Sequence, residues 1–312
     1  MNPRVLLAGL VLAASCTGEP SPPPRTGAVS GTSVSPQAES GSPTRLPHKR
    51  KEPAVAAPRA PLPRGPKAAA VELRYLGRVI PRVVDRWLKS GGRLEHSLAR
   101  TLSHASLREQ KLYRLLAARQ GWARRVASRL PASLARKLRA HTDAGRKLRT
   151  LVTPLRPPVR LPTTRPASPH VLRRFYEKGE ERFGVAWEVL AAVNLVETRM
   201  GRLTGPSPAG ARGPMQFIPS TWDVHGRGDI MDPHDSILAA ARYLDAAGAP
   251  EDMRGALFAY NNADAYVDAI VTYAREIMRD ERAFYSYYFW QVFVLTTRGD
   301  LQLTGPGAAR TR

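Results

Sequence analysis

Apolar residues recur at spacings of three and four over two long stretches of the chain, which is the period of a helix face. The first stretch runs from about residue 69 to residue 151. Its helix faces are, in order, Leu76, Ile80, Val83 and Trp87; Leu94, Leu98 and Leu102; Leu112, Leu115 and Leu116; Trp122, Val126 and Leu130; and Leu134 and Leu138 after Pro131. The pattern therefore predicts a small, all-helical segment over residues 69–151.

The second stretch, residues 169–303, also follows the helical period. Helices are predicted to begin at Pro169 and to cover residues 186–197, 219–224, 233–247, 252–260 and 265–278. The segment 283–295 contains seven aromatic residues, which predicts that it packs back onto the domain. No stretch alternates convincingly as a strand would, so the fold class expected is all-α.

Three segments are expected to be linkers. Residues 17–68 are rich in proline, serine and arginine and hold few large apolar side chains, which predicts a disordered tether. Residues 152–168 are a second proline-rich linker, and residues 304–312 are expected to form a disordered tail.

The start of the chain has the pattern of an export signal. Met1–Arg4 is positively charged, Val5–Ala14 is apolar and too short to span a bilayer comfortably, and small residues precede Cys16. Residues 1–16 resemble a bacterial lipobox signal with Cys16 as the lipidation site; a plain secretory signal and a short uncleaved anchor remain open. Cys16 is the single cysteine of the chain, which excludes a disulfide framework and a cysteine-based metal site.

Charge separates the two helical stretches. The net charge of +22 is concentrated in residues 72–150, where 20 basic and 5 acidic residues give +15. Residues 169–303 carry 14 basic and 18 acidic residues, which gives −4. Because the chain is expected to be exported, anionic envelope polymers and lipid headgroups are better candidate partners for 72–150 than nucleic acid, which is unlikely; a merely solvated helix face is the plain alternative.

Glu197 is the candidate catalytic residue. It ends an apolar stretch that includes Trp187, Leu190 and Val193, and Gly201 ends the helix shortly after it. Burial raises the pKa of a carboxyl, so an acid placed here can stay protonated near neutral pH. Taken alone, the pattern is also met by surface or salt-bridged glutamates.

Three short blocks carry a more specific signal: Glu197-Thr198, the run from Gly213 to Trp222 that reads Gly-Pro-Met-Gln-Phe-Ile-Pro-Ser-Thr-Trp, and Ala259-Tyr-Asn261. In this order and spacing they resemble the lytic transglycosylase domain of the lysozyme superfamily. The basic helical segment and the aromatic tail through Leu303 also resemble flanking regions of secreted actinobacterial-type members. The resemblance covers residues 169–280. It implies a mainly α-helical, lysozyme-like catalytic domain over 169–303 that acts on peptidoglycan, cleaving MurNAc-β-1,4-GlcNAc bonds and leaving 1,6-anhydro-MurNAc ends.

The resemblance also implies roles for single residues. Glu197 would be the one catalytic acid and base, with Tyr260 placing its hydroxyl near it. Supporting or substrate-binding positions would be Thr198, Gly213, Met215, Gln216, Phe217, Tyr260 and Asn261. Asn262 departs from the glycine common after Ala-Tyr-Asn, which raises the question of whether the loop needs a positive φ there.

The residues also leave functional alternatives open. A water-using muramidase would employ the same Glu197, and a catalytically dead peptidoglycan-binding protein would keep the blocks without the chemistry. Neither a cofactor nor a metal is expected. Asp229, Asp232 and Asp235 do not have the spacing of an EF-hand and are predicted to form turns and caps.

Overall fold

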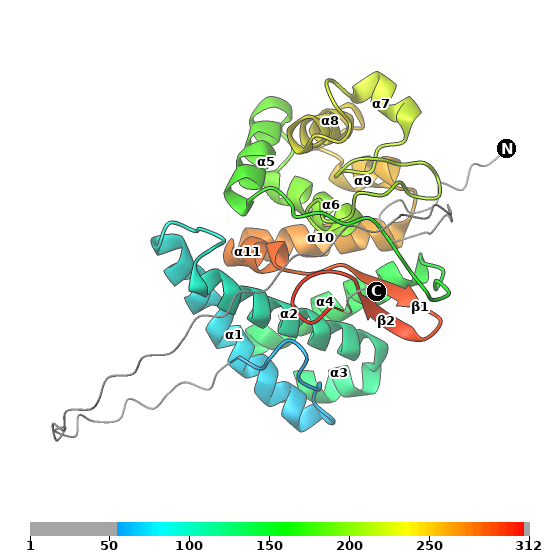
Figure 1. The fold of residues 1–312 in the computed structure, drawn as a ribbon. Helices are drawn as coiled ribbons and strands as arrows, with labels where there is room; N and C mark the ends of the chain where they lie inside the picture. Colours follow the sequence, from blue (N-terminus) through cyan, green and yellow to red (C-terminus); the bar gives the residue numbers. More distant parts are fainter. Residues whose placement is uncertain (1–54, 309–312) are drawn as a thin grey trace, which may run out of the picture. The chain divides into compact units, whose positions relative to one another are not determined.

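The computed structural model describes residues 55–308, and helices make up most of them (Figure 1). The predicted signal segment 1–16 with Cys16, the part of the predicted tether up to residue 54, and residues 309–312 lie outside the described residues. The expected all-α class is confirmed.

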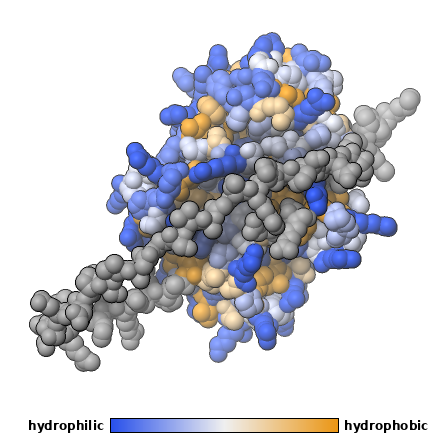
Figure 2. All heavy atoms as spheres, viewed as in Figure 1, coloured by the Kyte–Doolittle hydropathy of each residue, from blue (hydrophilic) through white to orange (hydrophobic). Residues whose placement is uncertain are grey.

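Four helices form the basic segment: α1 (Pro66–Lys89), α2 (Ser97–Ala118), α3 (Gln120–Ala127) and α4 (Ala132–Thr150). The predicted apolar face of α1, which consists of Leu76, Ile80, Val83 and Trp87, is buried. Two of the predicted faces, those around Leu98 and Leu112, belong to one helix, α2, because no glycine or proline interrupts the chain between them. Many basic side chains of these helices remain exposed. On the face shown in Figure 2, hydrophilic residues cover most of the edge of the molecule, and smaller hydrophobic areas lie between them.

The second stretch contains seven helices and one hairpin. The helices are α5 (Pro169–Phe183), α6 (Trp187–Thr198), α7 (Pro219–His225), α8 (Pro233–Ala246), α9 (Met253–Tyr260), α10 (Asp264–Arg279) and α11 (Arg282–Tyr288). Strands β1 (Phe293–Thr296) and β2 (Gly299–Gln302) pair antiparallel, with Val294 opposite Leu301. The hairpin was not predicted, because four-residue strands are too short to display a period of two.

Helix α10 joins the two stretches into one core. It packs against α4 of the basic segment and against α6, which ends at Glu197 (Figure 1). The same buried cluster contains Trp87 of α1, whose ring meets Tyr285 and Phe289 edge-on at 5.8 Å. His141 of α4 bonds through Nε2 to the hydroxyl of Tyr287, at 2.7 Å.

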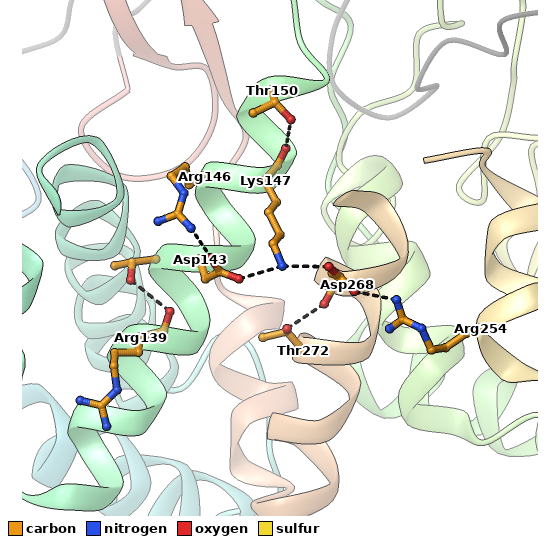
Figure 3. A network of polar contacts seen from close by, with 9 residues as sticks. Arg139, Asp143, Arg146, Lys147, Thr150, Arg254, Asp268 and Thr272 are labelled. Atoms are coloured by element: carbon orange, nitrogen blue, oxygen red, sulfur yellow. Dashed lines mark hydrogen bonds and ion pairs between the residues drawn. The ribbon is translucent and has the colours of Figure 1, made fainter. Parts of the chain in front are cut away.

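Polar contacts reinforce the contact between α4 and α10 (Figure 3). Lys147 lies 2.8 Å from Asp268 and 3.1 Å from Asp143, and Arg254 donates to the other oxygen of Asp268 at 2.8 Å. These groups are partly exposed, so each pair adds little to stability by itself. Together with the buried aromatic contacts they fix how the basic segment sits on α10.

Parts of the predicted tether, of the linker 152–168 and of the tail 304–312 are ordered against the folded core. Arg108 donates to the carbonyl oxygens of Ala60 and Pro61, at 2.7 and 2.8 Å, so the last part of the predicted tether lies against α2. Leu155, inside the predicted linker, pairs with Thr296, and Thr304 donates to Gln291 at 2.9 Å. Proline-rich composition did not predict this order, because here the segments exchange hydrogen bonds with distant residues, through carbonyls that accept and through the Thr304 hydroxyl that donates.

Residues 55–308 all fall in one compact unit. Within this part of the chain, no helix combines the length and the apolar character needed to cross a bilayer.

Candidate active site

Glu197 lies in the last turn of α6, a helix in which eleven of twelve residues are buried. The helix ends immediately afterwards, because Arg199 and Met200 both adopt left-handed backbone conformations with φ of 55° and 61°. The Glu197 side chain is only 2% exposed. The prediction of a buried acid at the end of an apolar helix is therefore confirmed.

One oxygen of this carboxyl is held and the other has no partner. Tyr266, in the first turn of α10, donates its hydroxyl to Oε1 of Glu197 at 2.8 Å. Oε2 is buried and has no hydrogen-bond partner among the described residues. The arrangement fixes the carboxyl and leaves one oxygen available for a further contact.

Burial also sets the protonation state of Glu197. Loss of water around the carboxyl raises its pKa to about 8, while the Tyr266 hydrogen bond and the positive charge of Arg199 act in the opposite direction. The carboxyl is therefore mostly protonated at neutral pH, which is the state that a general acid needs.

Thr198 organises the loop that follows the helix. Its hydroxyl donates to the carbonyl oxygen of Pro214 at 2.6 Å and accepts from the backbone N–H of Gly201 at 3.0 Å. Asn194, one turn earlier on α6, donates to the same Pro214 carbonyl at 2.8 Å. Thr198 thus ties the end of α6 to the second sequence block rather than facing away from it.

The second block forms a tight turn whose backbone needs unusual conformations. Gly213 has φ of +74°, and a Cβ at this position would overlap the carbonyl oxygen of Ile230. Gln216 has φ of +53°, and its Nε2 donates to the carbonyl oxygen of Gly213 at 3.0 Å. Its Oε1 is buried without a partner.

The side chains of Met215 and Phe217 lie in the core, with exposures of 0% and 3%. The carbonyl oxygen of Met215 accepts a hydrogen bond from the hydroxyl of Tyr260 at 2.6 Å, and the ring of Phe217 packs edge-on against Tyr260 and Trp222. These residues therefore connect the second block to the third.

The third block lies beside the carboxyl without a hydrogen bond to it. The hydroxyl that donates to Glu197 belongs to Tyr266, whereas the pKa of Tyr260 is raised first by burial and then by the nearby charge of Glu197. Asn261 is buried, and its Oδ1 has no partner. Asn262 has no positive φ, so the loop does not need glycine there.

The three blocks share a further property. Six side-chain atoms in the described residues are buried without a hydrogen-bond partner. Three of the six lie in the sequence blocks, one in each: Glu197 Oε2, Gln216 Oε1 and Asn261 Oδ1. Leaving a buried polar atom unpaired is unfavourable, so each such atom is a position at which a ligand or a water can form a hydrogen bond. All three are oxygens, and the two amide oxygens can only accept hydrogen bonds.

Sequence reasoning missed Tyr266 as a site residue. It lies in the predicted helix 265–278 and is buried on α10. The one signal that could have indicated more is a hydroxyl on an otherwise apolar face, close after the third block.

The aspartates near the start of α8 accept hydrogen bonds from backbone N–H groups. Asp232 caps α8 by accepting from the N–H groups of His234 and Asp235, and Asp235 accepts from the N–H of Asp229. Ligand atoms of Asp232, His234 and Asp235 lie within 4.8 Å of one another. Because the aspartates already accept these bonds, the turn and cap roles account for them.

Comparison with known families agrees with the geometry. Residues 174–281 match the family described as the transglycosylase SLT domain. This part of the chain is therefore an SLT-type domain of the lysozyme-like superfamily, as the three blocks indicated.

Similar proteins are also named as transglycosylases. The chain is 34% identical over 105 residues to "Membrane-bound lytic murein transglycosylase F" of Thiobacillus denitrificans, covering 31% of this chain and 22% of that protein. It is 34% identical over 107 residues to the protein of the same name from Methylobacillus flagellatus, covering 32% and 22%. The chain thus spans about a fifth of the length of these relatives. No solved structure matches it.

Proposed function

We propose that residues 169–303 act as a peptidoglycan lytic transglycosylase, cleaving MurNAc-β-1,4-GlcNAc bonds and forming 1,6-anhydro-MurNAc ends. The observation that carries the proposal is the buried, mostly protonated carboxyl of Glu197 with one unpartnered oxygen, at a block of the SLT domain. The printed names of the relatives, lytic murein transglycosylases, support the same chemistry.

The reaction needs one group that gives and then takes a proton. In the first step Glu197 protonates the glycosidic oxygen, and the bond from that oxygen to C1 of MurNAc breaks. In the second step the C6 hydroxyl of the same sugar bonds to C1 and its proton returns to Glu197. Atoms and protons balance without water or a separate carboxylate nucleophile, unlike the usual pair of glycosidase carboxylates.

The other site residues support this step. Tyr266 keeps Oε1 occupied and so directs Oε2 to the glycan. Gln216 and Asn261 offer acceptor oxygens to hydroxyl or N-acetyl N–H groups of the strand. Thr198, Gly213, Met215, Phe217 and Tyr260 hold the loop that positions these acceptors.

The location proposed is the cell envelope. The relatives are named membrane-bound, which supports envelope association, and lipidation at Cys16 would supply an anchor. Residues 17–54 would then act as a tether between the anchor and the folded part. The basic character of 72–150 would attract anionic polymers of the envelope.

Mass spectrometry of purified peptidoglycan digested by the full chain tests the proposed reaction. We expect fragments with anhydro ends, and none when Glu197→Gln replaces the wild type. Fragments with reducing ends, which are heavier by one water, would instead indicate a muramidase. Binding without any fragments would indicate a peptidoglycan-binding protein.

A further inference from the structure

A second candidate site lies away from Glu197, between the basic segment and the C-terminal helices. A pocket of about 410 Å³ is lined by α1, by Glu109 of α2, by the first turns of α4, and by the end of α10 with residues of α11. Its lining includes charged side chains from all of these elements. None of the residues of the three sequence blocks lines it.

Three carboxylates in the lining are already paired with cations of the lining. Glu109 accepts from Lys137 at 2.9 Å, Glu276 from Arg279 at 2.7 Å, and Asp280 from Arg282 at 2.7 Å. The charges of these pairs cancel.

Three other arginines of the lining are not part of these ion pairs. Arg74 and Arg78 come from α1 and Arg136 from α4, and none has an acidic partner among the described residues. All three are exposed. The pocket therefore carries a net positive charge that the protein itself does not neutralise.

Two of the arginines stand close together on α1. Arg74 and Arg78 lie four residues apart on one helix, where like charges repel and weaken the helix. Within the described part of the chain, no carboxylate forms an ion pair with either arginine. An anionic ligand in the pocket would do so.

The shape of the pocket selects the kind of ligand. Gly77 lies on α1 between the two arginines, and a Cβ there would stand 3.2 Å from Leu134 of α4. The two helices therefore approach closely within the lining, and the site is a recess rather than a flat face. A single strand of a polymer can enter a recess, whereas a bilayer meets mainly protruding surfaces.

We propose that this pocket binds a phosphate group of a phosphodiester-bearing polymer. Guanidinium groups from two helices can each donate to a different phosphate oxygen, while a carboxylate is satisfied by one arginine fork. The pocket is also larger than one phosphate needs, which leaves space for the sugar or polyol on either side. Binding at this pocket does not depend on the reaction proposed at Glu197, so either proposal can fail without the other.

The test measures binding of the full chain to polyglycerol phosphate by titration calorimetry. Replacing Arg74, Arg78 and Arg136 together with glutamine is expected to weaken binding by about tenfold or more, because three charge-assisted contacts are lost. The matched control replaces Arg64, Arg86 and Arg125, which are exposed, lie outside the pocket and remove the same charge. Its effect should stay within about twofold.

A second variant separates the pocket from general attraction between charges. Ser133 is exposed and lines the pocket, so Ser133→Trp should fill the recess without changing any charge. We expect it to weaken binding as the pocket triple variant does, and inorganic phosphate to displace the polymer better than sodium chloride of equal ionic strength.

Three results would overturn the proposal. One is equal loss of binding in the pocket and control triple variants, and another is unchanged binding by Ser133→Trp. The third is pocket-dependent binding to phosphatidylglycerol vesicles without binding to the polymer, which would assign the site to a membrane surface.

Discussion

The hydroxyl of Tyr266 donates to Oε1 of Glu197 at 2.8 Å and thereby joins the first turn of α10 to the last turn of α6. The two residues are 69 positions apart in the chain. Because this bond favours the ionised carboxyl while burial opposes it, Tyr266 both orients Glu197 and moderates its raised pKa.

The first prediction concerns the pH dependence of cleavage. If protonated Glu197 is the acid, kcat/KM should fall as pH rises through about 8, the pKa of the carboxyl. Tyr266→Phe removes the hydrogen bond that lowers this pKa, so the alkaline limb should move to higher pH. A continuous assay of peptidoglycan solubilisation between pH 6 and 10 would measure both profiles.

Tyr260→Phe is the matched control for that measurement. Its hydroxyl bonds to the carbonyl oxygen of Met215 and makes no hydrogen bond to Glu197. We expect reduced activity with an unmoved alkaline limb. A limb that shifts equally in both variants would count against a direct role of Tyr266.

The second prediction concerns stability. The free glutamate ionises at about 4.3, whereas folded Glu197 keeps its proton to about 8. Between these values the unfolded chain binds fewer protons, so the free energy of unfolding falls as pH rises. Glu197→Gln does not titrate and should gain stability relative to wild type, by on the order of 3 kcal/mol between pH 4.5 and pH 7.5.

Urea unfolding of both proteins at several pH values would measure this difference. Glu251→Gln, which removes an exposed carboxyl, serves as the control and should show no comparable trend. A constant difference between wild type and Glu197→Gln over this pH range would contradict the raised pKa.

The third prediction concerns Thr198. Thr198→Val keeps the shape but loses the bonds to Pro214 and Gly201, so the free energy of unfolding should drop by about 1–3 kcal/mol. Thr198→Ser keeps the hydroxyl and should retain most of the stability and activity. Thermal unfolding followed by circular dichroism would compare them, and equal losses in both variants would show that the methyl group matters instead.

The fourth prediction compares two glycines with similar backbones. Gly210 and Gly213 have φ of +83° and +74°, but a Cβ would meet nothing within 4 Å at Gly210 and would overlap Ile230 at Gly213. Gly210→Ala should cost about 1–2 kcal/mol from backbone strain alone. Gly213→Ala should cost more, about 3 kcal/mol in total, because of the added overlap. Denaturant titration of both variants would test the order.

The fifth prediction concerns the division of the chain. The sequence analysis separated residues 169–303 from the basic segment by a linker, but in the structure Tyr273, Tyr287 and Trp290 pack against His141 of α4. Removing residues 55–151 would expose these rings. We therefore expect the 169–303 fragment to aggregate or to lose cooperative unfolding, while the 55–308 fragment stays soluble. Equal solubility and equally sharp melting of the two fragments would show that residues 169–303 form an independent domain.

The sequence by itself determined the helices and singled out Glu197 as the proposed acid. Apolar residues at helical spacing and proline or glycine at the ends are local features, so α5, α6 and α8 begin within a residue of their predicted starts. Glu197 was recognisable because it ends an apolar helix next to a glycine-rich loop and belongs to a specific set of blocks.

Only the tertiary structure decided which groups meet. The bond from Tyr266 to Glu197, the common core of the basic segment and α10, and the pocket with Arg74 and Arg136 all join residues far apart in the chain. Helical periodicity tells which face of a helix is buried but not what covers it. The partners of a buried hydroxyl or an exposed arginine are set by how helices pack against one another, which no local pattern encodes.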